Sequence, residues 1–474
     1  MAEKRKTIDL NTKYNLPNEY QIIDFKGKIL IIAPECFNYI VLSNEIQKEI
    51  YLSLYNSTIQ EVLDKFKGEE NNVKVVITQI EAKNFIENSL EKSKGGLQMH
   101  LFLTNKCNLR CRHCYMFSGE SYENELSEKE IKDLLFGFKE NKGKYLILSG
   151  GEVATRKDFF NIIEYAHNIG LEVSIMTNGT LWTDEMIDRA TKFLSGVQVS
   201  IDGYNKEEYE KVRGKGQFEK AMHCVDRFVT NNIRTTVAIT PWPEASLSEK
   251  IESYLNFEKS LKEKYKDYPI FVKYTADIME GRELNLSQEE VKDYKNTMLQ
   301  IADGLNPKKR HDIMHTRFKE KILSDNWCTY GHLTISAEGD VFFCGKIQFL
   351  KPYGNIREIS IEEIMKNAQI ARSLSKIQHI APCNKCALKY ICGGDCRIKF
   401  VKEYSDCKEI CNQRANAIFI RECTAELREE YYQIMIDINH LLYSLIIYII
   451  LTVLLCVQNR KLIMKSLICL IICK

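Results

Sequence analysis

The sequence has no excess of charge of either sign. Its 66 lysines and arginines are balanced by 64 aspartates and glutamates, which gives a formal net charge of +2. Proteins that bind nucleic acid electrostatically carry a strongly basic surface, and this composition gives such a function no support. We therefore expect no nucleic-acid partner.

An apolar segment is also missing from the start of the chain. Residues 1–25 are polar and charged without a continuous hydrophobic stretch, so they do not form a secretory signal. We therefore expect a cytoplasmic, reducing location. There, clustered cysteines bind metals or carry out redox chemistry more often than they form disulfides.

Cysteine, in contrast, is abundant, with 17 residues in the chain. Cys36 and Cys224 stand alone, whereas three cysteines fall between residues 107 and 114 and eight between 328 and 411. This clustering predicts two separate metal or redox regions.

The chain has 474 residues, which is too long for one ordinary domain. In residues 1–94, three short apolar runs predict strands, and two helices, a strand at 73–79 and a further helical piece follow. We interpret this region as a winged-helix-like module. Its first helix carries Ile46, Ile50 and Leu54 on one face, and its second begins with a capping box of Thr58 and Glu61.

Residues 95–300 alternate six apolar strand runs with amphipathic helices, one of which begins with a capping box of Ser127 and Glu130. This α/β pattern predicts a parallel sheet curled into a partial (β/α)6 barrel. Such barrels place their chemistry in the loops that follow the strands. Residues 301–425 are rich in cysteine and are expected to be held together by metal ligands.

Residues 426–474 form a hydrophobic C-terminal tail. Its segment 441–457 has 17 residues without a charge, which is the lower limit for a bilayer span. Arg460 and Lys461 would then lie across the membrane, against the positive-inside tendency. A membrane anchor, with membrane association of the enzyme, and a buried or frameshift-derived apolar segment remain alternatives.

The first cysteine group directly follows a predicted strand. Cys107, Cys111 and Cys114 can wrap a 4Fe–4S cluster and leave one of its four irons without a protein ligand. A molecule with an amine and a carboxylate, such as S-adenosylmethionine (SAM), can chelate that iron. The alternatives are a structural zinc site, which usually has four ligands, or unliganded thiols.

This loop matches the CxxxCxxC signature of the radical SAM superfamily, and the chain resembles that family. Four further segments occur in the family's order: SGGE at 149–152, TNGT at 177–180, SIDG at 200–203 and KVRG at 211–214. The resemblance implies reductive cleavage of SAM to a 5′-deoxyadenosyl radical. It also implies SAM-binding roles for His113, Gly150, Gly151, Glu152, Asn178, Ser200, Asp202 and Arg213.

Within that set, the resemblance gives each segment its own part of SAM. The GGE segment meets the methionyl amino group, Asn178 faces the ribose, and Arg213 pairs with the carboxylate. Ser200 reaches SAM, and His113 is an aromatic packing residue near the adenine. Nothing in the spacing singles out a catalytic base.

The second cysteine group resembles the SPASM domain, a C-terminal extension of radical SAM enzymes. The resemblance implies two auxiliary 4Fe–4S clusters. It assigns Cys328, Cys344 and Cys396 to the first and Cys383, Cys386 and Cys392 to the second. Cys411 is expected to complete the second cluster, with Cys407 as the rival. Residues 318–327 lack the additional cysteine of some relatives, so the first cluster has an open iron or a non-cysteine ligand. A structural zinc pair is the alternative.

The N-terminal module resembles the precursor-peptide recognition element of ribosomal peptide-modifying enzymes, which binds a leader peptide by β-augmentation. The leading hypothesis is therefore a peptide maturase that installs a thioether or carbon–carbon crosslink in a precursor peptide. Its electron donor would be a flavodoxin or ferredoxin. The alternatives are a protein-modifying relative such as a sulfatase-maturating dehydrogenase, and a membrane-attached iron–sulfur electron carrier. The module could also simply pack on the barrel.

Overall fold

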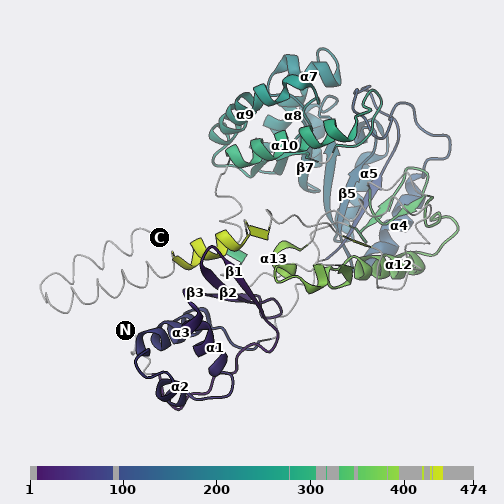
Figure 1. Cartoon of the computed structure of the whole chain (residues 1–474). Coiled ribbons are helices and arrows are strands. Elements are labelled where there is room, and N and C mark those ends of the chain that lie inside the picture. Colours follow the sequence, from purple (N-terminus) through teal and green to yellow (C-terminus); the bar gives the residue numbers. More distant parts are fainter. Residues whose placement is uncertain are drawn as a thin grey trace, which may run out of the picture.

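The structure is a computed structural model (Figure 1). It describes residues 8–88, 96–276, 278–305, 316–317, 330–345, 351–381, 383–393, 419–420, 428–429 and 431–440. Among these residues, no helix is long and apolar enough to cross a membrane. The predicted tail segment 441–457 lies outside the described residues, as do the predicted boundaries at 94 and 425. The remaining predicted boundary, at residue 300, falls inside helix α10 (Gln288–Leu305).

The N-terminal module is a three-stranded antiparallel sheet followed by helices. The strands, in the order β1-β2-β3, are β1 (Gln21–Phe25), β2 (Lys28–Ala33) and β3 (Asn38–Leu42). The helices are α1 (Glu45–Ser53), α2 (Ile59–Lys65) and α3 (Glu70–Lys83). The capping box of Thr58 and Glu61 is confirmed at the start of α2. Ile50 and Leu54 are buried as expected, but Ile46 is exposed on α1.

The strand predicted at 73–79 is wrong, because these residues lie in α3. Their β-branched composition favours a strand, but Val73, Val76, Ile77 and Ile80 recur at helical spacing and are all buried. Packing of this apolar face against α1 and β3 outweighs the local propensity.

The two faces of the N-terminal sheet pack against different partners. Ile29, Ile31, Ile40 and Leu42 join the core formed with α1–α3. The alternate residues, such as Leu30 and Ile32, join the main core instead. On that second face, Tyr39 donates its hydroxyl hydrogen bond to the Met435 carbonyl at 3.1 Å. The helical segment 431–440 therefore covers the sheet face opposite α1–α3, as Figure 1 shows.

The six predicted barrel strands are confirmed and are parallel. They are β4 (Leu97–Phe102), β5 (Gly143–Ser149), β6 (Glu172–Thr177), β7 (Leu194–Ser200), β8 (Arg234–Ile239) and β9 (Ile270–Tyr274). The helices between and after them are α4 (Glu128–Glu140), α5 (Phe159–Asn168), α6 (Asp184–Ala190), α7 (Lys206–Arg213), α8 (Phe218–Thr230), α9 (Ile251–Lys264) and α10. Short 3-10 turns occupy Val153–Thr155 and Ala245–Lys250.

The C-terminal region extends the barrel sheet, which the sequence did not predict. Strands β10 (Leu333–Ile335) and β11 (Val341–Phe342) make an eight-stranded sheet in which β10 runs parallel to β4. The other described elements are α12 (Ile361–Leu374), β12 (Ile380–Ala381), α13 (Lys389–Cys392), β13 (Phe419–Ile420) and 3-10 turns at Ile377–His379 and Cys383–Lys385.

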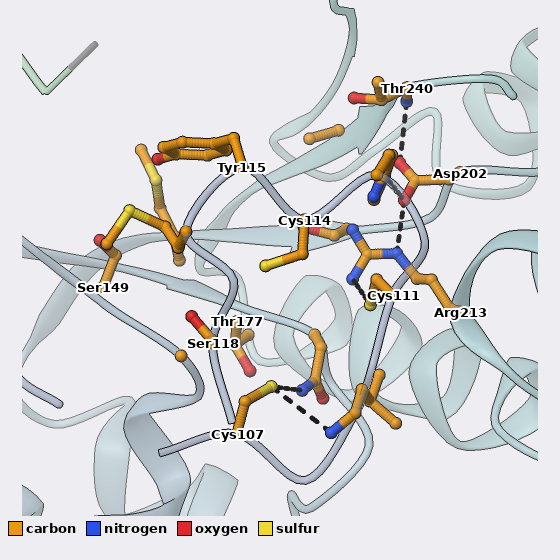
Figure 2. A pocket seen from close by; sticks show the side chains of 18 of the residues that line it. Cys107, Cys111, Cys114, Tyr115, Ser118, Ser149, Thr177, Asp202, Arg213 and Thr240 are labelled. Carbon is orange, nitrogen blue, oxygen red and sulfur yellow. Dashed lines mark hydrogen bonds and ion pairs between the residues drawn. The ribbon is translucent and has the colours of Figure 1, made fainter. Parts of the chain in front are cut away.

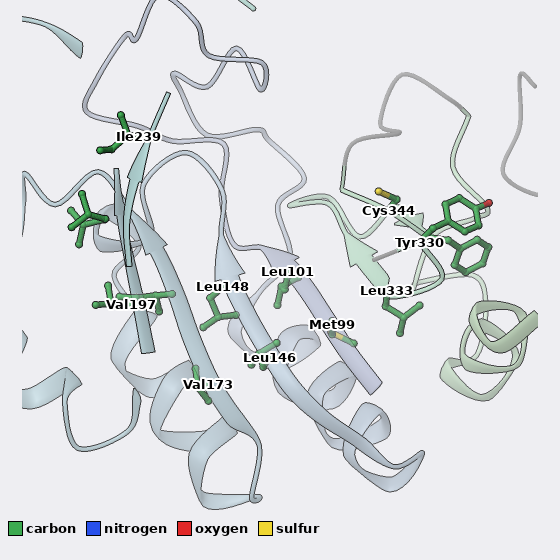
Figure 3. Close-up of a cluster of buried hydrophobic side chains, with 14 of the residues drawn as sticks. Met99, Leu101, Leu146, Leu148, Val173, Val197, Ile239, Tyr330, Leu333 and Cys344 are labelled. Atoms are coloured by element: carbon green, nitrogen blue, oxygen red, sulfur yellow. The ribbon is translucent and has the colours of Figure 1, made fainter. Parts of the chain in front are cut away.

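The barrel strands alternate between a core face and a pocket face. Met99, Leu101, Leu146 and Leu148 are fully buried in the core against the helices (Figure 3). Side chains of a strand point alternately to opposite faces. The residues that alternate with these core positions, such as Ser149, therefore turn to the concave side. That side contains the site described below.

The capping box that begins α4 is confirmed and also contacts the C-terminal region. Ser127 Oγ accepts from the Glu130 backbone at 3.3 Å, and Glu130 also pairs with Arg357 at 2.6 Å. We expect Ser127→Ala to cost about 1 kcal/mol. The midpoint of thermal unfolding should fall by about 2 °C. Ser127→Asn retains a capping oxygen and should restore most of the loss; an unchanged midpoint in Ser127→Ala would contradict the role.

Candidate functional site

The predicted cluster-binding loop follows β4 and is closed by its own backbone. Cys107 N donates to the Gly119 carbonyl at 2.8 Å, and Gly119 N donates to the Asn105 carbonyl at 3.0 Å. Figure 2 shows the sulfurs of Cys107, Cys111 and Cys114 turned toward the same space inside this loop. Burial raises the pKa of Cys111 to about 11, so iron must displace thiol protons when it binds.

The three cysteines line a cavity of about 310 Å³ at the ends of the barrel strands. Seven of the eight residues expected to bind SAM also line it: His113, Gly150, Gly151, Asn178, Ser200, Asp202 and Arg213. These residues come from four loops or strand ends and from the C-terminal end of α7. The structure therefore brings together segments that are more than 100 residues apart in the sequence.

Glu152 is the exception, because it does not line the cavity. Its carboxylate is fully buried and accepts from Thr177 Oγ1 at 2.6 Å and from Asn178 N at 2.7 Å. Burial raises the pKa of Glu152, although these hydrogen bonds act in the opposite direction. In the structure this carboxylate joins the GGE and TNG segments. The SAM-binding role that the family resemblance implies for Glu152 stays a prediction.

The two glycines of the GGE segment are required by a neighbouring loop. A Cβ on Gly151 would lie 2.3 Å from the Lys106 carbonyl oxygen, and one on Gly150 would lie 2.3 Å from that of Thr104. Gly151 N donates to the Thr104 carbonyl at 2.7 Å. These two glycines therefore let the backbone of the GGE segment approach the start of the cysteine loop.

Asn178 ties the TNG segment to the same loop. Its amide nitrogen donates to Asn108 Oδ1 at 2.9 Å and lies 3.9 Å from Cys107 Sγ. On the other side of the cavity, Arg213 Nη1 lies 3.8 Å from Cys111 Sγ. N–H groups that point at cysteine sulfurs are a usual means of tuning the potential of an iron–sulfur cluster.

A buried charged network lies behind the cysteines. Asp202 Oδ2 accepts from Arg213 Nε at 2.5 Å and from His113 Nε2 at 2.8 Å, and Oδ1 accepts from Thr240 N at 2.8 Å. Burial opposes ionisation of Asp202, but Arg213 and His113 outweigh it and lower its pKa to about 2. Asp202 thus neutralises Arg213, the residue expected to pair with the SAM carboxylate.

The cavity's donor set fits a 4Fe–4S cluster with a polar ligand. Three thiols face the cavity, and the buried atoms His113 Nδ1 and Ser118 Oγ have no hydrogen-bond partner among the described residues. No three His, Cys, Asp or Glu side chains in the described ranges converge closely enough for a single metal ion. The cysteine ligands of a cubane stand further apart than those of one ion, because the cluster is larger.

The second cysteine group is only partly described. Cys383, Cys386 and Cys392 line a second cavity of about 290 Å³. Cys344 is buried beside β11 and does not line it, and its assignment to the first auxiliary cluster stays a prediction. Cys328, Cys396, Cys407 and Cys411 lie outside the described residues, so the choice between Cys407 and Cys411 stays a prediction.

Sequence reasoning missed the uncharged wall of the first cavity. This wall includes Tyr115, Met116, Met176, Gln198, Thr275, Ile278 and Met279. Met176 and Gln198 could have been found, because they alternate with the buried core residues Ile175, Val197 and Val199. Thr275, Ile278 and Met279 follow β9 without any motif, and only the fold places them at the cavity.

Comparison with known proteins identifies the class that this fold and site define. Residues 101–255 match the radical SAM superfamily, and residues 327–387 match SPASM, an iron–sulfur cluster-binding domain. The AdoMet-dependent heme synthase of Methanosarcina barkeri is 30% identical over 323 residues, which cover 63% of this chain and 90% of that protein. The chain therefore belongs to the radical SAM superfamily, and its C-terminal region is a SPASM domain.

Two further similar proteins are of interest. Mycofactocin maturase MftC of Mycobacterium tuberculosis is 26% identical over 315 residues, or 62% of this chain and 76% of that protein. The structure of anSMEcpe with bound AdoMet and Cp18Cys peptide has a TM-score of 0.51 at 17% identity, covering 74% of this chain and all of that one. As a member of this family, the chain is an enzyme. Its radical SAM domain binds a 4Fe–4S cluster and SAM, and its SPASM domain binds auxiliary iron–sulfur clusters.

Proposed function

We propose that this chain is a peptide maturase. It would bind a ribosomally made precursor peptide by its leader and join two residues of that peptide through a thioether or carbon–carbon bond. Two similar proteins support the proposal: MftC is named as a maturase, and anSMEcpe holds AdoMet together with a peptide.

The observation that carries the proposal is the attachment of the N-terminal sheet to the SPASM domain. Gln21 on β1 donates to the Lys385 carbonyl at 2.7 Å. Glu35, after β2, pairs with Lys389 at 2.6 Å and accepts from the Tyr390 hydroxyl at 3.0 Å. These contacts place a sheet with edge strands β1 and β3 next to the second cysteine group. An edge strand can accept an extended leader peptide by β-augmentation.

The cavity favours an uncharged substrate group over a tetrapyrrole. Arg213 is the only arginine or lysine among the described lining residues, and Asp202 already neutralises it. A haem or haem precursor, as made by the heme synthase relative, carries propionate carboxylates that need cationic partners when buried. The wall of Met176, Met279 and Thr275 suits a neutral amino-acid side chain instead.

The cavity residues have two roles: some would bind the cluster, and others line the space for the substrate. Cys107, Cys111 and Cys114 would hold the 4Fe–4S cluster, which together with SAM supplies a 5′-deoxyadenosyl radical. Asn178 and Arg213 direct N–H groups at two of these sulfurs. The uncharged wall would surround the space where a hydrogen atom leaves the substrate.

A crosslink requires the loss of two hydrogens from the peptide. One would leave as a hydrogen atom, and the other as a proton together with one electron, which the bound cofactors would accept. We propose the auxiliary clusters as the first acceptor. We further propose a flavodoxin or ferredoxin as the external electron donor, and a reducing, cytoplasmic compartment as the site of action.

The proposal is tested with the reconstituted enzyme, SAM, dithionite and candidate precursor peptides taken from short reading frames next to the gene. The modified peptide should be lighter by about two hydrogens per crosslink. Tandem mass spectrometry should give no fragments between the two joined residues. A peptide lacking its leader should react much more slowly, which serves as the matched control for recognition by the N-terminal module.

Three other outcomes would each overturn the proposal in a different way. Intact SAM cleavage with an unmodified peptide would exclude this substrate class. A loss of two hydrogens that yields an aldehyde, trapped by a hydrazine, would indicate a dehydrogenase of the sulfatase-maturating kind. No 5′-deoxyadenosine at all would indicate an electron carrier.

A further inference from the structure

The segment that follows β9 packs along the cysteine loop. Arg282 N donates to the Cys114 carbonyl at 3.2 Å, and Glu283 N donates to the Arg112 carbonyl at 2.7 Å. A Cβ on Gly281 would lie 2.5 Å from the His113 carbonyl oxygen, so the two backbones are in close contact. Residues 281–283 therefore run beside residues 112–114 of the loop.

The Arg282 side chain joins two further points of the same loop. Nη1 donates to the Cys111 carbonyl at 3.2 Å, and Nη2 donates to the Ser118 carbonyl at 2.5 Å. In the described part of the chain, Arg282 has no carboxylate partner, so its charge is directed at these two carbonyls. The planar fork of a guanidinium presents a separate nitrogen to each carbonyl, an arrangement that the single nitrogen of a lysine ammonium does not reproduce.

The neighbouring residues extend this attachment to the substrate side. Ile278 and Met279 line the cavity, three to four residues before Arg282. Arg112, between two cluster cysteines, pairs with Glu283 at 2.6 Å and lies 4.1 Å from the Trp242 ring. One short segment thus contributes both to the cavity wall and to the support of the cysteine loop.

We propose that Arg282 is a positioning residue for the SAM-binding cluster. It touches neither the cavity nor a thiol, and it acts by fixing the backbone on both sides of Cys114. This fixes the directions in which the Cys111 and Cys114 thiols face the cavity. The inference rests on the cluster and SAM assignment of the cavity and is independent of the peptide proposed as substrate.

The test compares Arg282→Lys with wild type, without any peptide. Three quantities are measured on the reconstituted full chain: iron content, the change in the electron paramagnetic resonance spectrum on adding SAM, and 5′-deoxyadenosine formation against SAM concentration. Misplacement of about 1 Å at a reacting centre can cost up to 100-fold. We expect Arg282→Lys to keep its iron but to need about 10-fold more SAM for the spectral change.

Arg189→Lys is the matched control. Arg189 carries the same side chain but is held by a carboxylate and an aromatic ring, Glu164 at 3.9 Å and Phe160 at 4.4 Å, and it is not in the cysteine loop or the cavity. Its SAM dependence should equal that of wild type. A wild-type SAM titration in Arg282→Lys would overturn the proposal. Equal loss of iron from all clusters, with a lowered melting temperature, would also overturn it by showing a general structural role.

Discussion

Replacing Cys111 by alanine is expected to remove about four of roughly twelve iron atoms from the reconstituted chain. Reductive cleavage of SAM should fall by about three orders of magnitude or more, because the cluster loses one of three ligands. Iron and sulfide analysis and the rate of 5′-deoxyadenosine formation measure the two effects. The auxiliary clusters should remain, since Cys383, Cys386 and Cys392 line a separate cavity.

Cys224→Ala is the matched control for this prediction. Cys224 is fully buried in the core on α8 and does not line either cysteine cavity. Its replacement should leave both the iron content and the SAM cleavage rate unchanged, apart from a modest loss of stability. Retention of SAM cleavage in Cys111→Ala would contradict the assignment of the first cysteine loop.

Asp202→Asn should have the second largest effect. Asp202 is 1% exposed and neutralises Arg213 while it orients His113. Removing one partner of a buried ion pair leaves an uncompensated charge and typically costs 3–5 kcal/mol, so we expect a loss of about that size. SAM binding should also weaken, because Arg213 and His113 both line the cavity. Thermal unfolding and a SAM titration measure these effects.

The surface of the same domain offers a control with the same three residue types. Asp184 contacts His223 at 2.8 Å and Arg227 at 3.1 Å, and the carboxylate side chain is 52% exposed. Exposed pairs contribute about 0–1 kcal/mol, so Asp184→Asn should change stability little. Equal losses in the two variants would show that burial of the Asp202 network has no special effect.

The Asp202 pKa also predicts a pH dependence. The pKa of this carboxyl falls from its ordinary value of 3.8 to about 2 on folding, so the ionised form stabilises the native state. This contribution, about 2 kcal/mol, is present above pH 4 and is lost as the pH falls from about 4 to 2. In the cluster-free chain, Asp202→Asn should therefore remove this part of the pH dependence of the free energy of unfolding, which acid unfolding measures.

Much of the barrel was predictable because its information is local. Each of the six strands is a short apolar run bounded by turn residues, and the capping box of Ser127 and Glu130 marks a helix start. The strand predicted at 73–79 failed for the opposite reason. There, β-branched residues favour a strand, and only the neighbouring α1 and β3 decide that the apolar side forms one face of a helix.

In the site, too, some features follow from local sequence and others only from tertiary packing. The spacing of Cys107, Cys111 and Cys114 lies within one loop, so the sequence alone determined the cluster chemistry. The position of Glu152 under the cavity, with its oxygens used by Thr177 and Asn178, depends on the packing of two strand ends. These two hydrogen bonds therefore could not be predicted from the GGE motif alone.

The sequence by itself determined the cysteine chemistry, the order of the modules and the six barrel strands, because each depends on residues close together in the chain. The tertiary structure decided three other features: the extension of the barrel sheet by β10, the uncharged cavity wall and the support of the cysteine loop by Arg282. These features join residues that lie far apart in the chain, in one case by more than 200 positions. Such contacts form through packing and backbone hydrogen bonds and leave no periodic pattern in the sequence.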